Sequence, residues 1–201
     1  MSEGRTVFVI DDDAAVRDAI AFLLQSAGFA VTAFASGEAF LAAYDGTARG
    51  CAVLDVRMPS LDGLSLQREM NARGWRLPAI FITGHGTVAT AIAALRAGAF
   101  DFIEKPIRDD ILLDSVRRAL DWEETARAKA ERRAEALRRY ATLTEREREV
   151  MRLVIDGDPN KVIADRLGIS QKTVEVHRAR VMEKMGARTL SALVRIGFEI
   201  E

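Results

Sequence analysis

Short runs of apolar residues alternate with amphipathic stretches along roughly the first 107 residues of the chain. The apolar runs predict strands at residues 7–10, 30–34, 51–55, 79–83 and 101–105. Between them, apolar residues recur at helical spacing, as in Val16, Ile20, Leu23 and Leu24. Parallel strands need crossover connections, so this alternation predicts an α/β fold with a five-stranded, doubly wound parallel sheet. We expect strands this apolar to be buried on both faces.

Residues 108–141 have a different character, because they contain no Gly or Pro and mix charges of both signs with alanines. This composition predicts one long, solvated helix. Leu113, Val116 and Leu120 are expected to dock on the preceding domain, and the apolar stripe thins to alanines after them. A coiled coil needs a more persistent apolar seam. Two interpretations stay open: a helical spacer, or a helix that also pairs in a dimer.

The last 60 residues are predicted to be helical throughout. Thr144 followed by Glu147 indicates a capping box that opens the first helix. Gly168 ends a short second helix, and Ser170 is expected to cap the third. Residues 190–198 supply the last helix. Two helices joined by a tight turn that contains glycine predict a helix-turn-helix within an all-α, four-helix domain.

These changes of pattern predict three segments: a domain at 1–121, a helical linker at 122–141 that continues its last helix, and a domain at 142–201. With 49% hydrophobic and 29% charged residues, the chain can bury real cores. No apolar run approaches the roughly 20 residues that span a bilayer, and the start lacks a signal-peptide pattern. The single cysteine, Cys51, lies in an apolar run and is expected to pack in the core. We therefore expect a cytoplasmic protein without a membrane partner.

Polar side chains follow the predicted strands at the edge where an open parallel sheet binds its ligands. They are Asp11, Asp12 and Asp13 after the first strand, Asp55 after the third, Thr83 after the fourth and Lys105 after the fifth. Asp13 is expected to cap the following helix. Clustered carboxylates repel unless a cation neutralises them, and such oxygen ligands suit Mg²⁺. A carboxylate can also act as a nucleophile and form an aspartyl-phosphate, which a metal, an ammonium and a hydroxyl would stabilise.

With these residues in order, the first domain resembles the receiver domain of two-component response regulators, a flavodoxin-like fold. The matching segments are VLDVRMPSLDG around Asp55, FITGHG around Thr83 and DFIEKP around Lys105. The resemblance implies that Asp55 accepts a phosphoryl group from a sensor histidine kinase. Thr83 and Lys105 would belong to the same catalytic site.

The same resemblance implies a cofactor site for Mg²⁺. Its ligands would be Asp12, Asp55 and the backbone carbonyl of Arg57, with Asp11 assisting through a water molecule. The peptide bond between Lys105 and Pro106 would be cis, as in the family.

Thr83 and Phe102 match the family's switch pair. On phosphorylation, the Thr83 hydroxyl would move toward the phosphate and the Phe102 ring would turn inward, as a two-state element. The responding surface, roughly residues 87–118, would form a homodimer. His85, between two glycines, is expected to be a solvated loop residue and to have no catalytic role.

The predicted helix SQKTVEVHRARVMEKMG, residues 170–186, has an apolar stripe of Val174, Val181 and Met185 and a cationic opposite side. An exposed valine among cations suits a helix in the DNA major groove. The last domain resembles the LuxR-type helix-turn-helix in LTEREREVMRLV, NKVIADRLGIS and KTVEVHRARVMEKM. By position, the predicted groove residues are Lys172, Thr173, Val176 and Arg180, and the predicted backbone contacts are His177 and Lys184.

Together the two resemblances indicate a FixJ-like member of the NarL class, a transcription regulator rather than an enzyme, which catalyses only its own phosphotransfer and autodephosphorylation. The implied partners are a sensor histidine kinase, double-stranded operator DNA and a second copy of the chain after phosphorylation, with RNA polymerase as a further candidate. Two alternatives stay open: a regulator that binds DNA without phosphate, and an aspartyl-phosphate phosphatase. Glu175 either accepts a hydrogen bond from cytosine or holds Lys172 or Arg178 in place.

Overall fold

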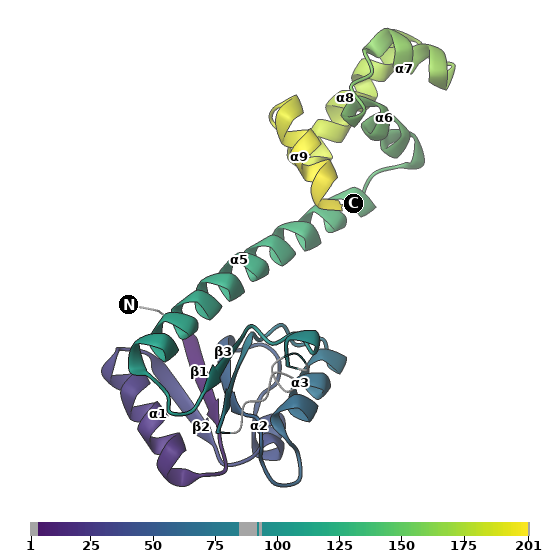
Figure 1. Ribbon diagram of the computed structural model, residues 1–201. Coiled ribbons are helices and arrows are strands. Elements are labelled where there is room, and N and C mark those ends of the chain that lie inside the picture. Colours follow the sequence, from purple (N-terminus) through teal and green to yellow (C-terminus); the bar gives the residue numbers. More distant parts are fainter. Residues whose placement is uncertain (1–3, 85–91, 93, 201) are drawn as a thin grey trace. The chain divides into compact units, whose positions relative to one another are not determined.

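The computed structural model of the chain describes residues 4–84, 92 and 94–200. The chain divides into two compact units, Met1–Ala126 and Arg127–Glu201, which we call the first unit and the second unit (Figure 1). Helix α5 (Asp109–Ala141) runs through the division, which therefore falls inside the predicted linker. The predicted domain boundaries at residues 121 and 142 stay predictions. In the described ranges, no helix has both the length and the apolar character needed to cross a bilayer.

The first unit is built on a five-stranded, all-parallel sheet with the strand order β2-β1-β3-β4-β5, which confirms the predicted fold class. The strands are β1 (Arg5–Ile10), β2 (Ala30–Phe34), β3 (Arg49–Asp55), β4 (Ala79–Thr83) and β5 (Asp101–Glu104). The helices described with them are α1 (Ala14–Ser26), α2 (Gly37–Ala43), α3 (Gly63–Ala72) and the first part of α5.

The expectation that every strand is buried on both faces is wrong for the two edge strands, β2 and β5; in β5 only Ile103 is buried. Ala30, Thr32 and Ala33 of β2 are exposed, and Val31 and Phe34 are only partly buried. The physical reason is the strand order, because β2 and β5 lie at the edges of the sheet and each has one neighbour. The apolar run predicts the strand correctly, but an apolar run does not indicate the position of its strand in the sheet.

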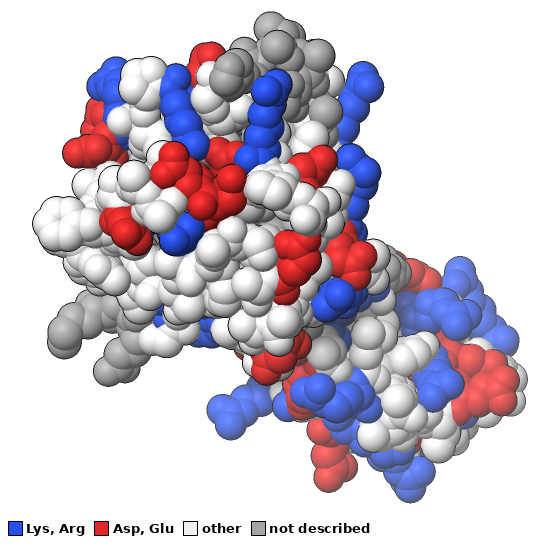
Figure 2. Space-filling view, turned by 90° about the horizontal axis from the view of Figure 1, so that it is seen from below, with Lys and Arg blue, Asp and Glu red and all other residues white. Residues whose placement is uncertain are grey.

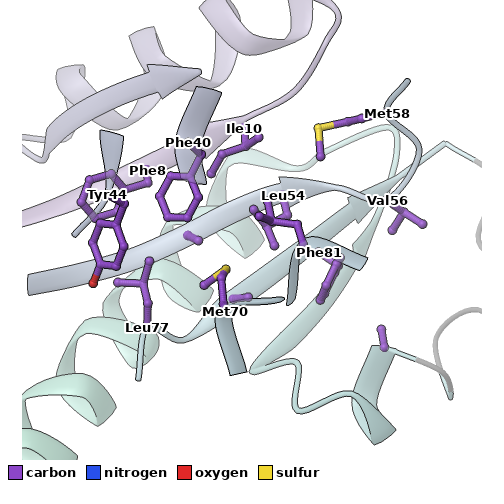
Figure 3. Packing of buried hydrophobic residues seen from close by; sticks show 14 residues of the cluster. Phe8, Ile10, Phe40, Tyr44, Leu54, Val56, Met58, Met70, Leu77 and Phe81 are labelled. Atoms are coloured by element: carbon purple, nitrogen blue, oxygen red, sulfur yellow. The ribbon is translucent and has the colours of Figure 1, made fainter. Parts of the chain in front are cut away.

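Alternate residues of the strands point to opposite faces of the sheet, and each face has its own core. Phe8 and Ile10 of β1 belong to the cluster completed by α2 and α3, which Figure 3 shows around Phe40 and Met70. Val7 and Val9 belong to the cluster completed by α1 and α5. The second cluster also contains Cys51, fully buried as predicted; desolvation, with the charge of Glu123, raises the pKa of its thiol to about 12.

The second unit contains the last part of α5 with α6 (Glu145–Ile155), α7 (Asn160–Leu167), α8 (Gln171–Met185) and α9 (Leu190–Ile200). The predicted capping box of Thr144 and Glu147 is present at the start of α6. Gly168 and Gly186 end α7 and α8 in the left-handed conformation, which glycine adopts without strain. The core joins α6, α7, α8 and α9, with Val174, Val181 and Met185 fully buried as the helical stripe predicted.

Candidate functional site

Asp11 and Asp55 bring two carboxylates to the carboxyl edge of the sheet. Asp55 is the last residue of β3, and Asp11 directly follows β1, the neighbouring strand. Asp11 is 2% exposed and Asp55 is 7% exposed, so both carboxylates are shielded from water. Gly63 at the start of α3 permits this packing, because a Cβ there would lie 2.3 Å from the carbonyl oxygen of Asp55.

Lys105 joins the two carboxylates. Its Nζ donates to Oδ1 of Asp55 at 2.7 Å and to Oδ2 of Asp11 at 3.3 Å. The backbone N–H of Arg57 donates to the other Asp55 oxygen at 2.6 Å, and the N–H of Asp13 donates to Oδ1 of Asp11 at 2.9 Å. One ammonium therefore serves two carboxylates, so these three side chains together carry a net negative charge. The guanidinium of Arg17 donates to the backbone carbonyls of Asp11 and Asp12. The peptide bond between Lys105 and Pro106 is cis.

Burial is the largest single influence on the protonation of the site. Desolvation by burial raises the pKa of Asp11 above its usual range; the charge of Asp55 raises it further, and the bonds from Asp13 and Lys105 only partly oppose this. Burial would lower the pKa of Lys105, but its bonds to Asp55 and Asp11 outweigh burial and raise it. Lys105 is therefore a firmly held cation, and the two carboxylates compete for it.

The other predicted residues of this site lie around the pair. Asp12 is exposed, and Asp13 caps α1 through bonds from the N–H groups of Ala15 and Val16, as predicted. Thr83 ends β4 at 2% exposure, and its carbonyl accepts the N–H of Lys105 at 2.8 Å.

The predicted switch and dimer surfaces are described only in part. Phe102 is half-buried and packs against the core cluster of α2 and α3. His85 and residues 87–91 and 93 of the predicted dimer surface lie outside the described residues. Within the rest of that surface, Asp101 and Arg118 form an ion pair at 2.7 Å.

The donor set at this edge suits a hard divalent cation. Two shielded carboxylates share one ammonium, so negative charge remains even before the exposed Asp12 is counted. Among residues 4–84, 92 and 94–200, no three Asp, Glu, His or Cys side chains are arranged to hold a metal ion. Mg²⁺ does not need three, because it usually binds one or two carboxylates and completes its shell with water and phosphate. Asp12, Asp55 and the Arg57 carbonyl therefore stay the predicted ligands, with Asp11 assisting.

The second unit presents a helix-turn-helix. The side chain of Ser170 caps α8 by accepting the N–H of Thr173 at 3.1 Å. Arg178 of α8 donates to Oδ1 of Asn160, the first residue of α7, at 2.7 Å. This bond, with the buried stripe of α8, fixes the two helices against each other. Arg178 thus has Asn160 as a partner, and the role of Glu175 stays a prediction with its alternatives open.

The side of α8 away from the core has the predicted character. Lys172, Glu175 and Arg180 are exposed, and Val176 is 45% exposed. Thr173 is half-buried and its hydroxyl shares a hydrogen bond with Ser170 at 2.8 Å. Among the described residues, Glu175 forms no ion pair with a cation.

Two residues predicted to contact the DNA backbone are placed differently from the rest. Lys184 donates to the buried carboxylate of Glu147 at 2.6 Å and to the carbonyl of Thr142 at 3.3 Å. The Lys184 ammonium therefore stabilises the second unit by pairing with Glu147. The sequence indicates the capping role of Glu147 but not this pairing. His177 is half-buried, and its Nδ1 has no hydrogen-bond partner. Contacts of both residues with DNA stay predictions.

Charge divides between the two units. The first unit contains 12 Lys and Arg against 18 Asp and Glu, and the second contains 17 against 12. The overall net charge of −1 is thus the sum of an acidic unit and a basic unit. Figure 2 shows acidic side chains gathered on one face of the first unit, with Lys and Arg beside them. The net positive charge of the second unit has the sign that favours binding to nucleic acid.

Family comparisons match both units. The response regulator receiver domain matches residues 7–117, and the luxR family of bacterial regulatory proteins matches residues 141–196. The chain belongs to the response regulators with a LuxR-type output domain. It is 48% identical to the transcriptional regulatory protein FixJ of Azorhizobium caulinodans over 98% of this chain and 93% of that protein. It is 41% identical to the response regulator protein TodT of Pseudomonas putida over 94% of this chain and 84% of that protein.

Solved structures of response regulators agree with this family. Full-length FixJ from B. japonicum is 46% identical, with a TM-score of 0.62 over 100% of this chain and 98% of that one. The response regulator StyR is 39% identical, with a TM-score of 0.84 over 98% of this chain and 99% of that one. These comparisons confirm the recognition of a FixJ-like response regulator that the sequence motifs supported.

Proposed function

We propose that this response regulator is a transcription regulator controlled by phosphorylation of Asp55. The observation that carries the proposal is the pair of shielded carboxylates held by one ammonium at the carboxyl edge of the sheet. A carboxylate desolvated in this way, beside a fixed cation, is placed to act as a nucleophile toward a phosphoryl group. The kinase partner follows from the receiver family.

In the proposed reaction, a carboxylate oxygen of Asp55 attacks the phosphorus of a phosphohistidine on the kinase. The new O–P bond forms as the N–P bond breaks, and the imidazole nitrogen departs with the bonding electron pair. Lys105 lies 2.7 Å from Oδ1 of Asp55 and would pair with the oxygens of the transferred group. Bound Mg²⁺, held by Asp12, Asp55 and the Arg57 carbonyl, would supply further stabilisation of their charge.

Phosphorylation would then act on the second unit through the switch pair and dimerisation. The hydroxyl of Thr83, at the end of β4, would turn toward the phosphate, and the half-buried Phe102 ring would move into the space that it leaves. The phosphorylated chain would dimerise and bind operator DNA. Lys172, Thr173, Val176 and Arg180 of α8 would lie in the major groove. A cytoplasmic location is part of the proposal.

The test is the mass in solution of the full chain, measured by light scattering with and without beryllofluoride and Mg²⁺. We expect wild type to change from monomer to dimer only with both additions. Asp55→Asn should stay monomeric, whereas Asp18→Asn, which removes an exposed carboxylate of α1, should behave as wild type. A dimer in every sample would instead support the alternative of a regulator that assembles without phosphate.

A further inference from the structure

The last turns of α5 contact the end of the helix that is proposed to read DNA. Helix α8 ends at Met185, and the following Gly186 has a φ of 67°. The N–H groups of Gly186 and Ala187 return to the carbonyls of Glu183 and Met182, as is common at helix ends. The carbonyl of Met185 instead accepts a hydrogen bond from Nη1 of Arg139, on α5, at 3.0 Å.

Arg139 is held in place by its own helix. Its Nε donates to Oε1 of Glu135, one turn earlier, at 2.7 Å. Oε2 of Glu135 is occupied by Arg138, at 2.6 Å from Nη2. A guanidinium fixed by a carboxylate in this way loses little further conformational freedom when it binds a carbonyl. A cation at a helix C-terminus is also favourably placed in the field of the helix dipole.

The approach of Arg139 to α8 is close enough to require glycine. A Cβ on Gly186 would lie 2.2 Å from Nη1 of Arg139, well inside contact distance. Nearby, Lys184 of α8 donates to the carbonyl of Thr142, just after α5. Ala136 is buried, and Tyr140 packs against the core of the second unit. The end of α5 is thus part of the packed second unit, although the luxR family match begins only at residue 141.

We propose that Arg139 is a positioning residue for DNA recognition: it holds the C-terminal end of α8 against α5, so that the exposed side of α8 meets DNA in one orientation. The proposal rests on the proposed DNA binding by α8. Arg139 itself does not contact DNA in this proposal. Its guanidinium acts through the Met185 carbonyl, and Glu135 acts through Arg139.

The test compares Arg139→Ala with Arg138→Ala in the full chain. Both variants remove one cation and one partner of Glu135, but only Arg139 reaches α8. The first probe is a DNA duplex enriched by the wild-type chain from a random pool, and the second is the same duplex with its sequence shuffled. Affinity for each is measured between about 50 and 200 mM salt, the range in which phosphate contacts are revealed.

We expect Arg139→Ala to bind the enriched duplex about tenfold more weakly and the shuffled duplex within about twofold of wild type. The salt dependence should be unchanged, and Arg138→Ala should stay within about twofold on both duplexes. Equal weakening on both duplexes, with a salt slope smaller by about one, would mean that Arg139 contacts a phosphate, and would overturn the proposal. Unchanged binding to both duplexes would overturn it as well.

A second measurement needs no DNA and therefore separates this proposal from the proposed function. Amide hydrogen exchange of residues 182–187 should be faster in Arg139→Ala than in Arg138→Ala or wild type, with α6 and α7 unchanged. Equal exchange in all three proteins would overturn the proposal, whether or not the chain binds DNA. Uniformly faster exchange across the second unit would also overturn it, because Arg139 would then only stabilise the fold.

Discussion

In each unit a lysine pairs with buried carboxylate groups, but the positive and negative charges balance in only one of the two units. In the second unit, Lys184 pairs with Glu147 alone, and the same carboxylate oxygen also accepts the N–H of Thr144 at 2.8 Å. In the first unit, Lys105 serves both Asp11 and Asp55. The pair with matched charges lies at a helix cap inside the family's DNA-binding domain. The group with surplus negative charge lies at the edge of the sheet that is proposed to bind a cation and a phosphoryl group.

The two groups differ in the effect of carboxylate charge on the stability of the unit. The hydrogen bond from Lys184, with that from Thr144, holds the pKa of Glu147 below its usual range. Burial and the neighbouring Asp55 raise the pKa of Asp11 instead. Opposite shifts mean that the charge of Glu147 stabilises its unit, whereas the charge of Asp11 destabilises its own. Destabilising charge of this kind is typical of functional sites.

A substitution in the Lys184–Glu147 pair should cause the greatest loss of stability. Glu147→Gln keeps a carbonyl oxygen for Thr144 but leaves the Lys184 ammonium without its counter-charge, so the free energy of unfolding of the second unit should fall by about 2 kcal/mol. The side chain of Glu147 is 3% exposed, so the new amide stays buried beside the Lys184 ammonium, whereas the Lys184 side chain is 34% exposed and water limits the loss to this size. Chemical unfolding followed by far-UV circular dichroism measures the change.

The control is Glu145→Gln, which removes an exposed carboxylate from the same first turn of α6 and should change stability by less than about 0.5 kcal/mol. Both tryptophans, Trp75 and Trp122, lie in the first unit, so tryptophan fluorescence reports whether that unit is affected. Equal losses from the two variants would contradict the role given to the Lys184 pair.

The pH dependence of the stability of the second unit should follow from the Glu147 carboxylate. Its pKa in the folded state lies below the ordinary value of 4.5, so its contribution is complete above that pH and is lost as pH falls through the folded-state pKa. The stability difference between wild type and Glu147→Gln should therefore be constant near neutral pH and shrink as pH falls below 4.5. A difference that stays constant into this acidic range would show that the substitution acts by a route other than charge.

A substitution of Asp11, which shares Lys105 with Asp55, should change stability least. Asp11→Asn can still accept the N–H of Asp13. It removes the desolvation cost of a buried charge and the repulsion from Asp55, which together outweigh the lost attraction to Lys105, so the first unit should keep its stability or gain up to about 1 kcal/mol. Unfolding followed by tryptophan fluorescence, with a chelator to remove divalent cations, measures it. A loss of more than about 1 kcal/mol would mean that Asp11 is held as a structural ion pair, like Glu147.

The sequence was sufficient to predict the strands, helices and caps, which depend on residues that are close along the chain. Continuous apolar runs predicted the strands, and apolar stripes with period 3.6 predicted the helices, because burial shapes the pattern of neighbouring residues. The Thr144 capping box and the Asp13 cap are local hydrogen bonds between residues at most three apart. The polar ends of the strands also followed, since parallel strands bring their carboxyl ends to one edge.

The pairing of charges and the identity of the two edge strands follow only from packing in space. Lys105 meets carboxylates 94 and 50 residues away, and Lys184 meets one 37 residues away. Arg139 reaches the end of α8 across 46 residues. The exposure of β2 and the closeness of Asp11 to Asp55 both follow from the strand order β2-β1-β3. Ion pairing depends on distance in space, and the periodicity of a chain does not contain that distance until the sheet and the helices have packed.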